Sequence, residues 1–331
     1  MDSFIYSINA TVPIFLVMIV GWVIKQLGVI DEHFVSKANK YVFHVALPVL
    51  LFQQISSADM TSQFDIRFVL YCMLATTAFF VIIWVVTELL MKDDTQKGSF
   101  VQCACRSSAA ILGMAFIQNM YSSTGMAPLM IVSAVPLFNI YSVIILTLKA
   151  HPEVKTGSAV KKEPHSAVIK RAFINVLKNP IIIGIVLGLP FSLLHVQFPV
   201  IINKTLTSIA QTATPIALIV IGAGFEGRKA IKKIKPTVIA TFIKLIGIAA
   251  VCLPIAVAMG YRNQELVAIL IMVASPTTVS CYIMSENMDN DGVLASSIIV
   301  LTTLLSSITL TGWIYLLRSI CLLYTSPSPR D

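Results

Sequence analysis

Two segments of the sequence carry charged and hydroxyl side chains inside otherwise apolar surroundings. They read CRSSAAILGMAFIQNMYSSTG over residues 105–125 and ASPTTVSCYIMSENMDNDG over residues 274–292. A charge inside an apolar helix is costly and usually faces a cavity or the interior of a helix bundle. We therefore expect Arg106 to attract an anion, with nearby hydroxyl groups completing a polar pocket. The hydroxyl candidates are Ser107, Ser108, Thr277, Thr278 and Ser280.

Each of these residues also has a structural interpretation. The long side chain of Arg106 can reach from an apolar helix to the membrane interface. A single hydroxyl group in a membrane helix more often bonds a neighbouring helix. Pro276 has no backbone N–H, so it either shapes a broken helix or produces a simple kink. Gly113 is a further candidate for the lining of the same cavity, and Tyr282 is a weaker one.

Three ionisable residues are candidates for coupling to an ion. Lys244 lies well inside an apolar run, where it could attract an anion, pair with an acid or bond a backbone carbonyl. Glu286 could carry a proton. His44 could titrate near neutral pH, although a hydrogen-bonded structural histidine is the more frequent finding. The expected coupling ion is a proton or sodium, and no other cofactor is indicated.

No catalytic or metal-binding pattern accompanies these residues. The apolar segments contain no HExxH, GxSxG or paired-carboxylate pattern, and no P-loop through which ATP could drive a reaction. The six cysteines form no CxxC pair and no Cys/His spacing that suits zinc. We therefore expect neither an enzyme nor a metal site, and we interpret the cysteines as small apolar packing residues.

The elements that must position these residues are membrane-spanning helices. Of the 331 residues, 56% are hydrophobic and 12% are charged, against about 25% charged residues in a soluble domain. Ten apolar runs are long enough to cross a bilayer, so the sequence predicts an all-α integral membrane protein with ten transmembrane helices. The runs lie near residues 5–25, 36–56, 66–90, 100–121, 125–148, 174–194, 200–222, 236–259, 264–285 and 293–317.

Basic residues in the connections predict the orientation of the spans. Counted over alternate connections, 17 Lys and Arg residues lie on one side and 4 on the other. Because cytoplasmic loops carry the excess of Lys and Arg, we expect both termini outside. The formal net charge of +8 follows from these loops and does not indicate nucleic acid as a partner. The expected location is the inner (cytoplasmic) membrane of a prokaryotic cell.

A shift of 167 residues aligns the two halves of the chain without a gap, so that Gly21 faces Gly188 and Pro48 faces Pro215. Five spans in each half would invert the second half relative to the first, which is a frequent plan of secondary transporters. In such proteins the substrate site lies where broken helices cross near the bilayer midplane, here spans 4 and 9. Pro48 and Pro215 are expected to break or bend spans 2 and 7 beside this crossover.

The expected units of the chain follow from this repeat. They are a first five-helix repeat over 1–148, a cytoplasmic linker over 149–173 and a second five-helix repeat over 174–320. The remaining residues, 321–331, read CLLYTSPSPRD. They are similar to the translation of a common sequencing adaptor, and we interpret them as a foreign tail rather than as part of the fold.

Five segments spread over both halves carry a family resemblance. They are HVALPVLLF (44–52), GSFVQCACRSSAAILGM (98–114), LKNPIIIGIVLGL (177–189), ATPIALIVIGAGF (213–225) and SPTTVSCYIMSENM (275–288). With these segments in this order, the chain resembles the auxin efflux carrier family, which includes bacterial malate permease-like proteins. The resemblance implies two inverted repeats of five helices, broken helices 4 and 9 that cross, and transport of an organic anion driven by an ion gradient or the membrane potential.

The chain departs from the family pattern at the crossover. Ser108 and Ser280 stand where relatives often carry asparagine, and Ala115 stands where a proline usually follows Gly113. Both serine positions lose an amide and have a shorter polar side chain. The departures leave the substrate and the coupling ion open.

The sequence therefore predicts a secondary active transporter of a small organic anion, such as malate, that works by alternating access at a midplane crossover site. A sodium–proton antiporter would normally need a buried acid at the crossover, and neither crossover segment has one at midplane. A non-transporting membrane sensor is the alternative from another class. The expected partners are the anion and the lipid bilayer; a homodimer stays open.

Overall fold

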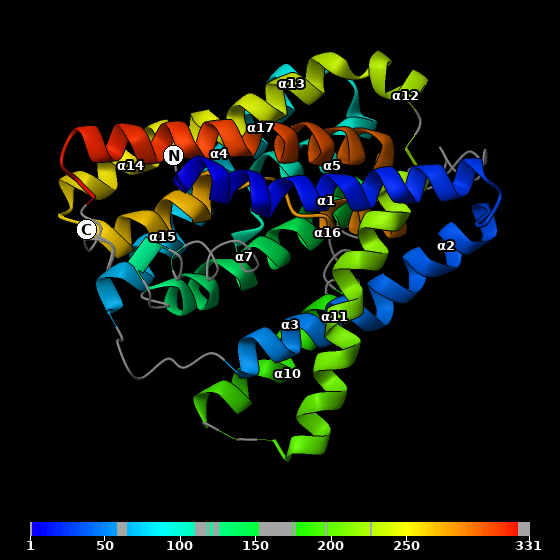
Figure 1. Ribbon diagram of the computed structural model, residues 1–331, viewed down its shortest axis with the longest axis horizontal. Coiled ribbons are helices and arrows are strands. Elements are labelled where there is room, and N and C mark those ends of the chain that lie inside the picture. The colour runs from blue at the N-terminus through cyan, green and yellow to red at the C-terminus, as the bar shows by residue number, and fades with distance from the viewer. Residues whose placement is uncertain are drawn as a thin grey trace.

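A computed structural model of the chain describes residues 2–57, 65–109, 117, 120–121, 126–151, 174, 177–194, 196, 198–225 and 227–323, with side chains from residue 12 onward. These residues form helices and connecting segments, and no strand occurs among them. Most of the expected linker and of the expected foreign tail lies outside this description. Figure 1 shows the start of α1 and the end of α17 at one end of the molecule, and the α1–α2 turn at the opposite end.

The first part of the chain forms helices near the expected apolar runs. The elements are α1 (Asp2–Gln26), α2 (Glu32–Tyr41), the π-helical segment η1 (Val42–Ala46), α3 (Leu47–Ser56), α4 (Ile66–Leu90), α5 (Asp94–Cys105) and α7 (Ala127–Leu148). Three aspartates start helices here because a carboxylate accepts the free N–H groups of a first turn. Asp31 caps α2, Asp65 caps α4 and Asp93 caps α5.

The described residues of the second part of the chain are also helical. The elements are α10 (Pro180–Leu193), α11 (Val200–Ala223), α12 (Gly227–Lys232), α13 (Ile234–Phe242), the π-helical segment η2 (Ile243–Gly247), α14 (Ile248–Ala258), α15 (Asn263–Ala274), α16 (Ser280–Asn287) and α17 (Gly292–Ser319). Asn179 and Asp291 cap α10 and α17. The helices α11, α13, α15 and α17 begin 165 to 169 residues after α2, α4, α5 and α7.

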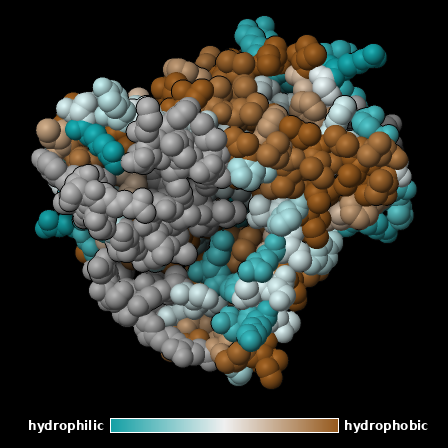
Figure 2. All heavy atoms as spheres, viewed as in Figure 1, coloured by the Kyte–Doolittle hydropathy of each residue, from teal (hydrophilic) through white to brown (hydrophobic). Residues whose placement is uncertain are grey.

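Five of the helices are long and apolar enough to cross a membrane. They are Ile66–Leu90, Ala127–Leu148, Val200–Ala223, Ile234–Ala258 (α13, η2 and α14 as one continuous rod) and Gly292–Ser319. Large apolar side chains on several of these helices point outward; Leu74 and Ile201 are 67% and 79% exposed. Figure 2 shows broad hydrophobic areas on the visible face. Such a surface suits contact with lipid, and the chain is a multi-pass membrane protein.

The helices pack as two bundles. The first bundle consists of α1, α2, η1, α3, α10 and α11, in which α1 packs on α11 and α10 packs on α3. The crossover bundle consists of α4, α5, α7, α13, η2, α14, α15, α16 and α17. The bundles meet where α1 packs on α17, where α10 approaches α7, and where α2 and α11 touch α16. The expected crossover helices α5, α15 and α16 therefore all lie within one bundle.

Two glycine contacts in the first bundle correspond to each other through the 167-residue offset, with the two halves of the chain exchanged. A Cβ atom on Gly21 of α1 would collide with the backbone oxygen of Ile219 on α11, and one on Gly188 of α10 would lie 3.0 Å from the backbone oxygen of Phe52 on α3. Gly188 follows Gly21 by 167 residues, and Ile219 follows Phe52 by the same number. The offset found in the sequence therefore also relates the partners of each glycine.

Gly222 should be intolerant of any side chain, because a Cβ atom there would overlap the backbone of Met18. We expect Gly222→Val to separate α1 from α11 and to destabilise the folded protein by about 1–3 kcal/mol, the usual cost of overpacking. Gly312 in α17 has no atom within 4 Å of such a Cβ, so Gly312→Val is the matched control. Thermal unfolding in detergent measures both; equal melting temperatures would contradict the close approach.

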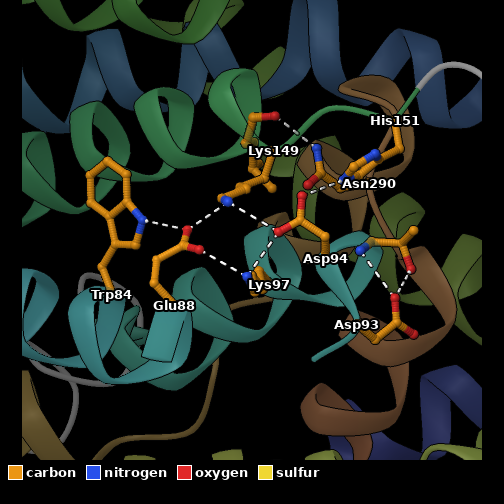
Figure 3. A network of polar contacts seen from close by, with 10 residues as sticks. Trp84, Glu88, Asp93, Asp94, Lys97, Lys149, His151 and Asn290 are labelled. Carbon is orange, nitrogen blue, oxygen red and sulfur yellow. Dashed lines mark hydrogen bonds and ion pairs between the residues drawn. The ribbon is translucent and has the colours of Figure 1, made fainter. Parts of the chain in front are cut away.

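Charged residues join α4, α5 and α7 at the end of the crossover bundle away from the chain's start. Lys97 lies 2.9 Å from both Glu88 and Asp94, and Lys149 lies 2.6 Å from Glu88 and 3.1 Å from Asp94. Figure 3 shows the two lysines between the two acids, with Trp84 donating to Glu88. Because each charge has two partners of opposite sign, this network holds the three helix ends together.

This network should make stability depend on pH. Partial burial alone would raise the pKa of Asp94, but hydrogen bonds from Lys97 and Lys149 outweigh it and hold that pKa below its ordinary value. A lowered pKa in the folded state adds stability above the unfolded-state pKa, and that stability is lost as the pH falls through the folded-state pKa. We expect the melting temperature to fall between about pH 5 and pH 3, and to fall less in Asp94→Asn. Identical pH profiles for both proteins would refute the role of Asp94.

Candidate functional site

Two half-helices, α5 and α15, end inside the crossover bundle and continue as extended backbone. Each end donates one hydroxyl hydrogen bond to a carbonyl in the last turn of the other. The Ser107 hydroxyl donates to the Met272 carbonyl, and the Thr277 hydroxyl donates to the Cys103 carbonyl at 2.7 Å. Each helix end thus supplies a hydrogen-bond donor for a free carbonyl of the other. In the membrane interior, where water is absent, backbone groups need such partners.

Pro276 explains why the second of these half-helices stops. A residue at this position would normally donate its N–H to the Met272 carbonyl, four residues earlier, but proline has no such donor. The Ser107 hydroxyl takes its place. The Pro276 carbonyl in turn accepts the backbone N–H of Ser108 at 2.9 Å. Ser107, Ser108 and Pro276 therefore connect the two helix breaks by hydrogen bonds.

Lys244 reaches this crossover from the π-helical segment η2. Its side chain is fully buried. The ammonium group donates to the Ser107 hydroxyl at 2.5 Å and to the Val273 carbonyl at 2.7 Å. It forms no ion pair with any of the described residues. A cation is favoured here because the last carbonyls of a helix form the negative end of its dipole.

Arg106 directs its guanidinium group toward α16 and α7. Its side chain donates to Asn139 and to Ser280, each at 2.9 Å, and lies 2.6 Å from the sulfur of Met284. The residue is 5% exposed, and its Nε atom has no partner within the described part of the chain. All its contacts there are with neutral groups. The positive charge is therefore buried and uncompensated, which is the property expected of an anion site.

A small pocket adjoins this guanidinium group, between the two bundles. Its cavity volume is about 50 Å³, enough for a few water molecules. The crossover bundle contributes most of the wall, and α3 and α11 contribute the rest. The lining residues include Arg106, Ser107, Ser108, Asn139, Thr278, Ser280, Leu51, Gln54 and Thr214.

The structure brings most of the expected site residues together. Arg106, Ser107, Ser108, Thr278 and Ser280 line the pocket, and the hydroxyl groups of Thr278 and Ser280 are 3.3 Å apart. A second group, Thr277, Pro276 and Lys244, supports the pocket from behind through the hydrogen bonds described above.

Other expected residues lie apart from the pocket. Tyr282 and Glu286 face a second, polar cavity of about 360 Å³ that α16 shares with α1 and α2. His44 is exposed, and its Nδ1 atom lies 3.0 Å from the Lys40 carbonyl. Gly113 is outside the described residues, and so is Ala115.

The two matched prolines behave differently. Pro48 is the second residue of α3, just after the π-helical segment η1, so span 2 is irregular next to this position. Pro215 lies within α11, which continues without interruption from Val200 to Ala223. Both prolines lie close to pocket-lining residues, because Leu47 on α3 and Thr214 on α11 face the pocket.

Sequence reasoning missed three polar residues of the pocket. Asn139 lies on α7 and accepts a hydrogen bond from the Arg106 guanidinium group, while Gln54 and Thr214 come from the first bundle. A signal for Asn139 existed, because an amide inside an apolar span usually faces the interior. Gln54 and Thr214 had no such signal, since their place depends on how the two bundles meet.

The chain matches known membrane transporters over most of its length. The family model described as "Membrane transport protein" matches residues 6–314. The chain belongs to this family, the auxin efflux carriers. It is 21% identical to an "Uncharacterized transporter" of Methanothermobacter thermautotrophicus, over 94% of this chain and 98% of the relative. It is 24% identical to a "Putative malonate transporter" of Rhizobium meliloti, over 93% and 94%.

A third relative has a similar identity and coverage. The "Uncharacterized transporter YfdV" of Escherichia coli strain K12 is 22% identical, over 95% of this chain and 98% of the relative. As an auxin efflux carrier family member with several membrane-length helices, the chain is a membrane transporter. At the pocket beside Arg106, a buried positive charge has only neutral partners among the described residues.

Proposed function

We propose that this protein is a secondary active transporter of a small organic anion that carries a carboxylate. The buried Arg106 guanidinium carries the proposal, because it borders a pocket and all its contacts within the described residues are neutral. A bound carboxylate would supply the missing negative charge and accept charge-assisted hydrogen bonds. Ser108, Thr278 and Ser280 would supply further donors around it.

The proposed architecture is ten spans in two inverted repeats of five, over 1–148 and 174–320, with both termini outside. The constant spacing of the helix starts and the exchanged glycine contacts support it. The position of the chain's start and of the end of α17 at one end of the molecule also fits (Figure 1). In such a repeat the broken helices expose their ends to a site between the halves.

Transport would proceed by alternating access. The pocket lies between the first bundle and the crossover bundle, and its volume of about 50 Å³ leaves no room for an organic anion. Movement of one bundle against the other would open it to one side at a time. The cavity at Tyr282 and Glu286 adjoins the same boundary and would form part of the route from one side.

The substrate we favour is a dicarboxylate of the size of malonate or malate. One carboxylate would pair with Arg106 as a bidentate acceptor. The relative named as a malonate transporter, at 24% identity, points to the same chemical class. A sodium–proton antiporter is less well supported, because none of the described residues that line the pocket is an acid.

For coupling, we propose that Lys244 acts as a built-in cation. In transporters with broken helices, the carbonyl ends of half-helices often hold a sodium ion. Here the Lys244 ammonium group bonds the Val273 carbonyl at the end of α15. Sodium would then be unnecessary, and a proton gradient or the membrane potential would drive the cycle.

The deciding experiment is uptake by the purified protein in proteoliposomes, with the chain ended at Ile320. The assay would offer labelled malonate and malate, then a panel of monocarboxylates and amino acids, with proton and sodium gradients imposed separately. We expect saturable uptake of a dicarboxylate under a proton gradient. Binding of a ligand without uptake, by protein shown to be folded, would instead favour a membrane sensor.

A further inference from the structure

A long apolar groove runs along the outside of the crossover bundle, away from the pocket at Arg106. One wall is α4, and the other is the continuous rod of α13, η2 and α14. α4 packs on α5 and α7, whereas the rod packs on α5, α15 and α17. The two walls are bridged where the Tyr71 hydroxyl donates to the Cys252 carbonyl at 2.5 Å, and the groove between them has a volume of about 1350 Å³.

Regular spacing makes the groove continuous. Every fourth residue of α4 from Leu70 to Leu90 lines one wall, and every fourth residue of the rod from Lys235 to Met259 lines the other. Two small residues, Ala78 and Gly247, lie midway along the two lining stretches. A Cβ atom on Gly247 would meet its first neighbour only at 3.8 Å, so the space there is open.

The length of the groove matches a bilayer. Its lining runs along α4 from Arg67 to Lys92. At a rise of 1.5 Å per residue this is about 37 Å, more than the hydrocarbon core of roughly 30 Å and less than the full membrane of about 45 Å. The charged residues at its ends therefore fall at the level of lipid headgroups.

One end of the groove is basic. Lys92 and Lys235 both line it there, both are exposed, and neither forms an ion pair with any residue that the structure describes. Asp93 lies at the same end, but its carboxylate already accepts hydrogen bonds from Thr95 and Gln96. Two free ammonium groups thus remain for a negatively charged headgroup.

We propose that this groove binds an anionic glycerophospholipid, with an acyl chain between α4 and the rod and the phosphate on Lys92 and Lys235. A bilayer supplies apolar chains to such a groove, and the two lysines select an anionic headgroup. A second copy of the chain fits less well, because a twofold axis along the membrane normal would bring the same lysines of both copies together. The lipid also contacts α5 through Phe100.

The test is lipid retention by the purified full chain. The protein is reconstituted in nanodiscs of equal phosphatidylglycerol and phosphatidylcholine with identical acyl chains, extracted again in mild detergent, and its retained lipids are quantified by mass spectrometry. We expect phosphatidylglycerol in excess. Since each lysine near a membrane contributes about 1 kcal/mol toward anionic lipid, Lys92→Gln with Lys235→Gln should reduce the excess about 30-fold, and either alone about 5-fold.

Matched variants separate the headgroup from the groove. Lys178→Gln, outside the groove, should leave the lipid ratio unchanged. Ala78→Trp fills the groove from an exposed position and should remove both lipids, whereas Val81→Trp, on the same helix but outside the lining, should not. The melting temperature of each variant confirms folding.

Two results would overturn the proposal. One is the absence of selection by the groove lysines, seen either as equal retention of the two lipids by the unaltered protein or as a loss of the excess in Lys178→Gln equal to that in Lys92→Gln with Lys235→Gln. The other is a dimer that dissociates in Ala78→Trp while lipid retention stays constant, which would assign the groove to a second copy. Neither result depends on uptake, so the lipid site and the transport function are tested independently.

Discussion

Arg106→Ala is expected to abolish uptake while leaving the amount of membrane-inserted protein unchanged. The variant removes the buried charge beside the pocket, together with its donors to Asn139 and Ser280. Loss of one partner of a buried charged pair typically costs about 2–5 kcal/mol. We therefore expect kcat/KM for uptake to fall by at least about 30-fold.

Two further variants define the cause of this loss. Arg106→Lys keeps the charge but loses the planar fork that binds a carboxylate through two hydrogen bonds, so it should retain a small part of the uptake. Arg318→Ala removes an exposed arginine far along α17 and should transport normally. Uptake in Arg106→Ala equal to that of the unaltered protein would remove this residue from the mechanism.

The second large effect is expected at Lys244. If its ammonium group serves as the built-in cation, replacing sodium with choline should leave the uptake by the unaltered protein within about twofold. Lys244→Ala leaves the Val273 carbonyl and the Ser107 hydroxyl without their cation, and each buried unsatisfied group costs about 1–3 kcal/mol. We expect this variant to lose uptake in choline and to recover part of it when sodium is added.

An exposed lysine, Lys204, provides the control for Lys244→Ala. Lys204→Ala on α11 alters a charge on the outer surface and should behave like the unaltered protein in both salts. A sodium gradient that drives the unaltered protein would contradict the built-in cation. So would normal uptake by Lys244→Ala in choline, since the crossover would then work without a charge at this position.

Hydropathy located the helices well because a span must be apolar over its whole length. The run expected near 66–90 coincides with α4, and those near 125–148 and 293–317 differ from α7 and α17 by two residues or fewer at each end. The breaks after α5 and α15 were also foreseeable, since Pro276 and the hydroxyl residues identify them. The ten-span inverted repeat remains a proposal.

The composition of the pocket was harder to predict. Tyr282 and Ser280 lie two residues apart on α16, about 200° around the helix axis, so one faces the second cavity and the other faces Arg106. Ser280 and Met284, four residues apart, share a face and both contact Arg106. The position of Lys244 behind Ser107 depends on how η2 packs on α5, and sequence spacing alone cannot give it.

The cysteines of the chain give it a built-in reporter of its own opening. Cys103, Cys105 and Cys281 are buried on the half-helices at the crossover, whereas Cys72 and Cys252 are buried on α4 and α14. An alkylating reagent can reach the first three only when the packing around the crossover itself opens. The rate at which those three thiols are modified therefore reports how often the crossover opens, against two internal references on the outer helices, without any engineered label.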